Sequence, residues 1–233
     1  MLRVLLSGNF TMQEILAQIL AVLLVIFLIL PFHEWAHAVT ALALGDKSIK
    51  SRGRLSINPI NHIDPIGALM LLLVGFGWAK PVPIDPRSFK HPKLGMAITA
   101  VMGPVANLVA ALVGMLVFNL IYYTQPGWLY QSGDFSNSFT LLYYFFTFYV
   151  SVNISLAVFN LIPIPPLDGS KVMFLFLPDR AVAFFYRYQN VFYIALFALM
   201  YAGALNGVLT HVTDWIGKGL AWVAYLPFKP FVG

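Results

Sequence analysis

Long apolar stretches separated by short polar segments set the pattern of this chain. Four stretches are long enough to cross a bilayer, because a spanning helix needs about 20 predominantly apolar residues; they are 14–44, 94–123, 139–164 and 190–211. A weaker stretch, 212–228, follows, and its Trp and Lys residues are typical of a segment at the membrane interface. The pattern predicts an all-α polytopic membrane protein with about four to five transmembrane helices.

One further apolar stretch, 66–79, is too short to cross the membrane. At about 1.5 Å per residue it reaches only about 21 Å, whereas the hydrocarbon core is about 30 Å thick. Gly75 and Gly77 interrupt it. Irregular backbone at membrane depth is tolerated where protein shields it, so the stretch predicts a re-entrant hairpin.

Basic residues predict the orientation of the chain. Lys and Arg gather in the connections 45–65, 80–93 and 165–189, while the connection 125–137 has none and carries Asp134. Cytoplasmic loops carry the excess of Lys and Arg in membrane proteins. We therefore expect the first three connections to face the cytoplasm and the last to face outward, in a multi-pass protein of the cell membrane.

Composition narrows the class further. The chain is 60% hydrophobic and 10% charged, with a mean hydropathy of +0.80, whereas soluble domains carry about 25% charged residues. We expect a single membrane-embedded domain over 1–233, with a core at about 14–190 and a C-terminal helix and tail at 190–233. The absence of cysteine excludes disulfides and thiolate metal sites. The net charge of +5 reflects the basic loops and does not indicate a nucleic-acid partner.

Ionisable residues on the first apolar stretch are the strongest chemical signal, in the segment "HEWAH". His33 and His37 are four residues apart, so on a helix they project from one face. Two imidazoles at that spacing suit two corners of a zinc site, and Glu34 between them is placed to act as base on a metal-bound water. The alternative is a pair of interhelical histidines with Glu34 bound to one of them.

A second signal, "NLIPIPPLDG" at 160–169, closes the third long stretch. Its prolines break the helix and favour extended backbone, so that Asp168 can turn back into the protein, with Gly169 permitting an unusual backbone angle. A carboxylate there completes a site of two histidines and one carboxylate with one position left for water. The alternative is that Asp168 caps the next helix.

These segments together resemble the site-2 protease family of intramembrane zinc metalloproteases. "GPVAN" at 103–107 is similar to its small-residue motif, and "GRLSINPINHIDPIG" followed by "GWAKPVPID" resembles the compact prokaryotic branch without PDZ or CBS domains. The resemblance implies one zinc ion bound by His33, His37 and Asp168, with Glu34 activating water. It also implies that Asn160 sits near the reacting carbonyl, and it favours a prokaryotic plasma membrane.

The side-chain amides of two asparagines each allow two interpretations. Asn160 could bind the oxyanion of the reaction, or simply satisfy loose carbonyls at a helix end. Asn107 could support the zinc site, or serve helix packing across the membrane. The weak alternation over 47–58 predicts a strand or hairpin near the active site, whose edge would hold an opened substrate.

Two histidines outside this constellation receive modest interpretations. His62 lies among turn-forming residues and is expected to hold local hydrogen bonds rather than a metal. His211 and Asp214 are expected to mark the outer membrane interface, with a second metal or proton site as the alternative.

The sequence therefore predicts a zinc metalloprotease that cleaves transmembrane or membrane-associated protein substrates within the membrane, with its site nearer the cytoplasmic face. The alternatives are a non-enzymatic metal or ion carrier using the same polar cluster, or a scaffold. Glu34 distinguishes them, because a carrier needs only ligands whereas hydrolysis also needs a base that does not bind the metal.

Overall fold

Helices make up almost all of the computed structural model, which describes residues 11–231 apart from 75–78, 125–129, 132–133 and 136. The elements are α2 (Met12–Leu24), the π-helix η1 (Val25–Ile29), α3 (Leu30–Ala43), α4 (Ser48–Ser51), α5 (Pro59–His62), α6 (Pro65–Val74), the 3-10 helix η2 (Pro86–Ser88), α7 (Pro92–Thr124), β1 (Tyr130–Gln131), β2 (Asp134–Phe135), α9 (Asn137–Asn160), α10 (Asp168–Leu175), α11 (Asp179–Arg187), α12 (Gln189–Tyr201), α13 (Asn206–Tyr225) and the 3-10 helix η3 (Leu226–Phe231).

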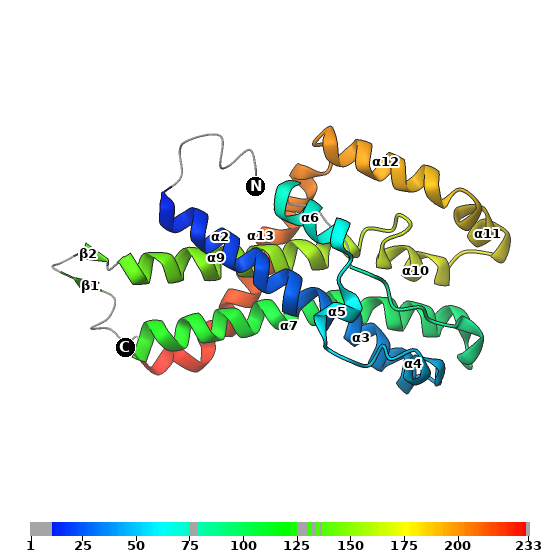
Figure 1. Ribbon diagram of the computed structural model, residues 1–233, viewed down its shortest axis with the longest axis horizontal. Coiled ribbons are helices and arrows are strands. Elements are labelled where there is room, and N and C mark those ends of the chain that lie inside the picture. The colour runs from blue at the N-terminus through cyan, green and yellow to red at the C-terminus, as the bar shows by residue number, and fades with distance from the viewer. Residues whose placement is uncertain (1–10, 75–78, 125–129, 132–133, 136, 232–233) are drawn as a thin grey trace.

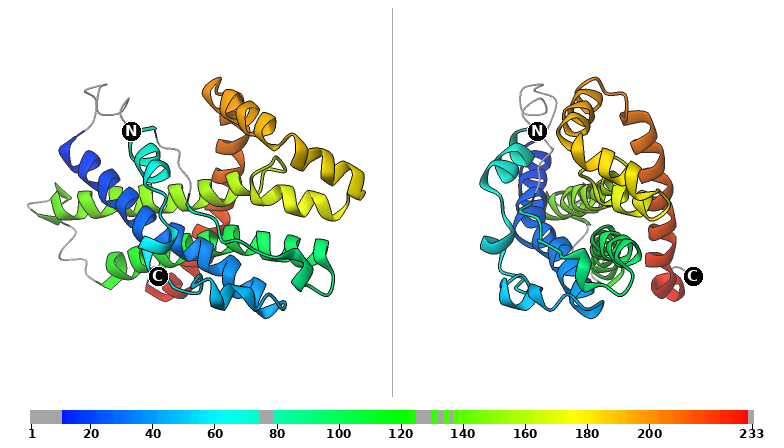
Figure 2. Two further views of the ribbon diagram at one scale, coloured as in Figure 1. Left: turned by 45° about the vertical axis from the view of Figure 1, so that its right-hand side comes forward. Right: turned by 90° about the vertical axis from the view of Figure 1, so that its right-hand side faces the viewer.

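Three layers of helices build the molecule. The α2–α3 helix crosses one side of α9 and α7, with α2 against α9 and α3 against α7, and α13 crosses their other side (Figures 1 and 2). Among the residues that the structure describes, three helices are long and apolar enough to span a membrane, namely Met12–Ala43, Pro92–Thr124 and Ser138–Asn160. The prediction of an all-α polytopic protein is confirmed. The bent pair α11–α12 brings the candidates to four if it counts as one span.

The first span is continuous but not uniform. Its central turn is the π-helix η1, in which the Leu30 N–H donates to the Val25 carbonyl five residues back. Pro31 follows directly and has no N–H with which to continue the ordinary ladder. Single π turns of this kind are frequent at functional sites, and this one lies immediately before the two histidines.

The predicted single helix over 190–211 is wrong. Helix α12 ends at Tyr201, and the chain turns through Gly203 at a φ of +71° before α13 begins at Asn206. Glycine adopts this left-handed conformation without the steric cost that a Cβ brings, so the helix ends where the glycine stands. The C-terminal stretch belongs to α13, which packs against α7 and α9 through residues such as Ile216 and Leu220.

The hairpin predicted at 66–79 has its two ends together. Ile63 and Ala79 form an antiparallel bridge, and the Lys80 N–H donates to the His62 carbonyl at 2.7 Å. Between them α6 runs for 10 residues, and 75–78 lie outside the described residues. The chain therefore leaves and returns at one point, and its re-entrant placement in the membrane stays a prediction.

The strand or hairpin predicted over 47–58 is wrong. That segment holds the short helix α4 followed by turns. The Asp46 carboxylate accepts both the N–H and the hydroxyl of Ser48, at 3.0 and 2.6 Å, which starts a helical turn rather than a strand. The described two-stranded ladder, β1 with β2, lies instead in the connection between α7 and α9.

Close packing of α7 on α9 depends on Gly114. A Cβ at this position would lie 2.6 Å from Cε1 of Tyr149 on α9. We expect Gly114→Ala to lower the free energy of unfolding by about 1–3 kcal/mol, because the buried ring must shift. Gly219→Ala on α13 is the matched control, since its added methyl meets nothing within 4 Å. Thermal unfolding in detergent measures both, and equal midpoints for the two variants would contradict this packing.

Candidate metal centre

Two histidines on α3 face α7 across a glycine. His33 and His37 are both buried, and their Nε2 atoms lie 3.1 Å apart. A Cβ on Gly103 of α7 would come within 2.4 Å of His37 Nε2 and 2.5 Å of His33 Cε1. The small residue of the "GPVAN" segment therefore makes the room in which the two imidazoles lie.

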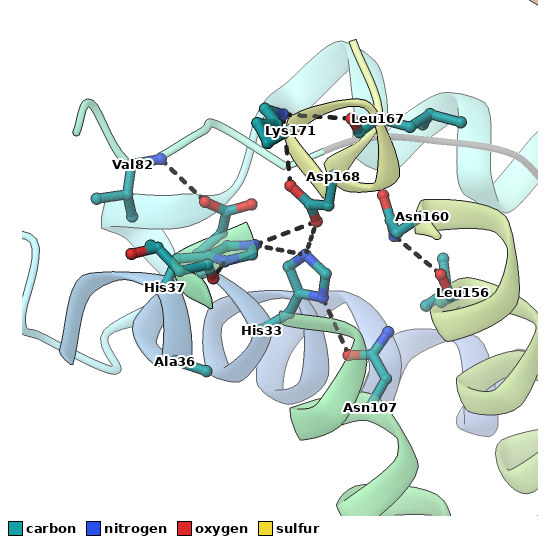
Figure 3. Close-up of polar contacts among 12 residues, drawn as sticks. His33, Ala36, His37, Val82, Asn107, Leu156, Asn160, Leu167, Asp168 and Lys171 are labelled. Atoms are coloured by element: carbon teal, nitrogen blue, oxygen red, sulfur yellow. Dashed lines mark hydrogen bonds and ion pairs between the residues drawn. The ribbon is translucent and has the colours of Figure 1, made fainter. Parts of the chain in front are cut away.

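Asp168 approaches the histidines from the turn after α9. Its Oδ2 lies 3.3 Å from Nε2 of both His33 and His37, and Figure 3 shows both rings directed at it. Asp168 is the first residue of α10, yet the cap residue is Leu167. The carboxylate is thus turned into the protein toward the histidines, as the metal-site interpretation requires.

Gly169 allows the start of α10 to lie close to the end of α9, and its backbone angle is not unusual. It is absent from the described glycines with positive φ, which are Gly45, Gly53 and Gly203. A Cβ on Gly169 would lie only 2.1 Å from the Leu161 carbonyl oxygen. The prediction of an unusual angle is therefore wrong, and the glycine instead lets α10 start directly against the end of α9.

Hydrogen bonds on the far side of each ring determine which nitrogen carries the proton. His37 Nδ1 lies 2.7 Å from the Thr99 carbonyl, and His33 Nδ1 lies 3.3 Å from the Asn107 Oδ1. Because both partners are acceptors, each Nδ1 must donate, which leaves a lone pair on each Nε2 of the neutral rings. Asn107 thus orients His33, a contact in line with its predicted supporting role.

Three lone-pair atoms consequently face one another at the centre of the site. The ligand atoms of His33, His37 and Asp168 all lie within 4.8 Å of one another. Between neutral imidazoles and an ionised carboxylate these lone pairs repel one another, and a metal cation at the centre would remove that repulsion. Two imidazoles and one carboxylate are a donor set that zinc accepts in tetrahedral catalytic sites. The residues present therefore fit the predicted metal.

Glu34 lies beside this group but belongs to a different contact. Its Oε2 accepts the Val82 N–H at 2.9 Å, and the side chain is buried. Val82 stands between Pro81 and Pro83, which have no N–H of their own. The tripeptide therefore offers one backbone donor, and this donor fixes the carboxylate.

The segment that carries Val82 is itself anchored from outside the site. The fully buried Asp46 accepts the Asp85 N–H at 2.8 Å, and Arg52 donates to the Pro83 carbonyl at 2.8 Å. Burial raises the pKa of Asp46, but the hydrogen bonds from Asp85 and Ser48 outweigh it and hold the pKa below its ordinary value. The carboxylate therefore stays ionised and keeps the segment in place.

Lys171 holds the second oxygen of Asp168, a role the sequence did not suggest. Its Nζ lies 3.5 Å from Asp168 Oδ1 and donates to the Pro166 carbonyl at 2.9 Å. Figure 3 shows it on the side of Asp168 away from the histidines. With Oδ1 engaged there, Asp168 presents Oδ2 alone to the metal position.

Asn160 lies beside the same site, at the end of α9. Its Nδ2 donates to the Leu156 carbonyl one turn earlier at 2.9 Å, which agrees with the helix-end interpretation. It also lines a cavity of about 460 Å³ together with His33, Glu34, Asp168 and residues of α7, α10 and α12. His62 lies outside this group and holds a local bond to the Ser56 carbonyl at 2.6 Å, as expected.

Sequence comparison agrees with this geometry. Residues 21–203 match Peptidase family M50. The chain belongs to this family. Membership, together with the apolar helices, places it among the membrane proteins of the zinc metalloprotease class. This agrees with the resemblance to the site-2 proteases noted from the motifs.

Individual relatives carry names of the same kind. The chain is 41% identical to the Bacillus subtilis protein named "Putative zinc metalloprotease YwhC" over 152 residues, which cover 64% of this chain and 67% of the relative. Proteins named "Putative zinc metalloprotease Rip2" are 28% identical in Mycolicibacterium smegmatis (59% of this chain, 49% of the relative) and 26% identical in Mycobacterium tuberculosis H37Rv (79% and 68%). The chain thus spans about half to two thirds of the length of these relatives. No solved structure matches it significantly.

Gly103 provides a test of the metal centre that leaves every ligand in place. We expect Gly103→Ala to weaken zinc binding by about tenfold or more, because the methyl displaces both imidazoles from their positions. Gly114→Ala is the control, since it disturbs the same helix away from the histidines. Zinc content at buffered free zinc measures the effect. Unchanged zinc affinity in Gly103→Ala would contradict the packing of the histidines on α7.

Proposed function

We propose that this M50 protein is an intramembrane zinc metalloprotease that hydrolyses peptide bonds of transmembrane or membrane-associated proteins. The observation that supports this proposal best is that the two carboxylates of the site, Asp168 and Glu34, make different contacts. Asp168 faces the two histidines, whereas Glu34 lines the same cavity and is held by backbone instead. A ligand set with an adjacent uncommitted carboxylate is what hydrolysis requires.

The metal ligands in this proposal are His33, His37 and Asp168, holding one zinc ion. When bound there, zinc would supply Lewis-acid chemistry, lowering the pKa of water and polarising the carbonyl to be attacked. The protein itself orients the ligand side chains before the metal binds. Thr99 and Asn107 hold the Nδ1 protons outward, so that both Nε2 lone pairs remain available.

Glu34 handles the proton in this proposal. Its Oε2 is occupied by the Val82 N–H, while Oε1 makes no hydrogen bond to a described residue. Oε1 takes a proton from the attacking water and then delivers it to the leaving amine nitrogen. The fixed Oε2 keeps the carboxylate from rotating between the two transfers.

Asn160 and Asn107 divide the supporting roles. Asn160 uses one N–H on Leu156 and lines the cavity, and we assign its second N–H to the carbonyl of the substrate. Asn107 positions His33 and does not line the cavity. The basic connections on either side of the site support a proposed position nearer the cytoplasmic face of a plasma membrane that the protein crosses several times.

The carrier and scaffold alternatives receive less support from this geometry. A carrier needs ligands and an open route, and a scaffold needs neither ligands nor a base. The Val82 contact orients the Glu34 carboxylate, which does not belong to the ligand group. Of the three functions, only hydrolysis uses such a carboxylate.

Glu34→Gln tests the proposed function directly. The amide keeps the shape of the side chain but cannot take a proton, so hydrolysis should fall by at least about 10²-fold while zinc content is unchanged. Purified wild type and variant in nanodiscs, with a transmembrane peptide as substrate, provide both readings. Equal hydrolysis by the two proteins would overturn Glu34 as the base. Zinc transport by both proteins without hydrolysis by either would support the carrier instead.

A further inference from the structure

Two charged residues of α13 lie far from the zinc site, in a groove between helices. Asp214 and Lys218, four residues apart, line a cavity of about 390 Å³ together with residues of α7 and α9, among them Phe118 and Ser151. Ser151 stands near the middle of the candidate span Ser138–Asn160. Asp214 therefore shares two cavities with the middle of a candidate spanning helix, and its position at the outer interface stays a prediction.

Neither charge has a partner within the part of the chain that the structure describes. Asp214 and Lys218 make no ion pair or hydrogen bond to a described residue, nor to each other. Ionisable residues at membrane depth are costly, and they usually pair or mark a functional site. An acidic side chain that is exposed beside a candidate span and has no partner among the described residues is available to a basic group of another molecule.

The groove leads to the zinc site. A second cavity of about 390 Å³ shares Ser151, Thr213 and Asp214 with the first. It also shares Leu156 and Phe159 with the cavity that holds the metal ligands. The three cavities therefore follow one another along α9. Figures 1 and 2 show α13 crossing α9.

Hydroxyl groups line this path at helical spacing. Thr147, Ser151 and Ser155 occur every fourth residue of α9 and line the two outer cavities between them. Small polar side chains allow close approach of helices in membranes and form hydrogen bonds across the contact. The face is thus built to receive a helix rather than loosely packed lipid chains.

We propose that this groove between α9 and α13 docks the transmembrane helix of the substrate, with Asp214 pairing a Lys or Arg near the middle of that helix. The inference rests on the proposed protease function and adds the feature by which a substrate is chosen. An acyl chain has no donor to offer at this depth. The three long candidate spans of a second copy of this chain contain no Lys or Arg except Lys93 at the end of one, so none of these spans could pair with Asp214 at mid-span.

The geometry also sets a spacing for the substrate. Ser151 and Asn160 are nine residues apart on α9, or about 13 Å. A substrate helix lying along α9 would therefore carry its basic residue about nine residues from the scissile bond, fewer where the chain is unwound. Moving the basic residue along the substrate should move the cleavage position with it.

Binding to Glu34→Gln protein in nanodiscs tests docking without turnover. The probes are poly-leucine transmembrane peptides with one Arg at the middle, or with Leu in its place. We expect the Arg peptide to bind about 3- to 20-fold more tightly, the range of polar contacts between membrane helices. Adding Asp214→Asn should remove this preference, and Lys218→Gln, the control, should leave or increase it. Equal binding of the two peptides, or a preference that survives Asp214→Asn, would overturn the proposal.

Cleavage separates failure of docking from failure of the proposed function. Proteins carrying wild-type Glu34 are given the Arg peptide, a series with Arg displaced by one turn, and an unstructured peptide. We expect the cleavage position to follow the Arg in wild type and not in Asp214→Asn, while both cleave the unstructured peptide equally. A cleavage position that ignores the Arg in wild type would overturn docking through Asp214. Absence of all cleavage together with retained Arg-dependent binding would overturn the protease function alone.

Discussion

Three lone-pair atoms that converge in a buried place are the constraint on which the rest of the structure depends. His33, His37 and Asp168 come from two elements 131 residues apart in the chain, and one metal cation would be a shared partner for all three. Contacts from the surrounding helices stabilise this convergence. Gly103 leaves space for the rings, the Thr99 carbonyl and Asn107 hold their protons outward, and Lys171 keeps the far side of Asp168 neutralised.

The proposed function gives the two carboxylates of the site different tasks, and the structure holds them in different contacts. Asp168 lies on the metal side because α10 starts against the end of α9, which Gly169 permits. Glu34 lies one residue from a ligand, yet it is drawn aside by the Val82 N–H. In the proposed function, the difference between ligand and base would thus be made by backbone contacts from other segments and not by the side chains themselves.

Much of the candidate ligand set could be predicted from sequence, because its spacing is local. "HEWAH" places two imidazoles on one helix face whatever the fold around it, and the proline-rich turn before Asp168 ends a helix by its own chemistry. The supporting contacts could not be predicted in this way. Thr99 contributes a carbonyl, which no side-chain pattern reveals, and Val82 contributes an N–H. The only signal for Val82 was its place between two prolines. The break at Gly203 and the helical turn at Ser48 were missed because a single residue outweighed the hydropathy pattern around it.

The π turn before the histidines has a geometric consequence. An extra residue within a helix rotates everything after it by about 100° relative to what precedes it. The continuous first helix can therefore pack against α9 with one face along α2 and against α7 with a different face along α3. Removing one residue from Val25–Ile29 would leave the helix able to cross the membrane, but it would swing the imidazoles away from Gly103. Pro31 and the π turn before it thus determine which way the face of α3 points. That direction decides whether His33 and His37 can form the candidate metal site.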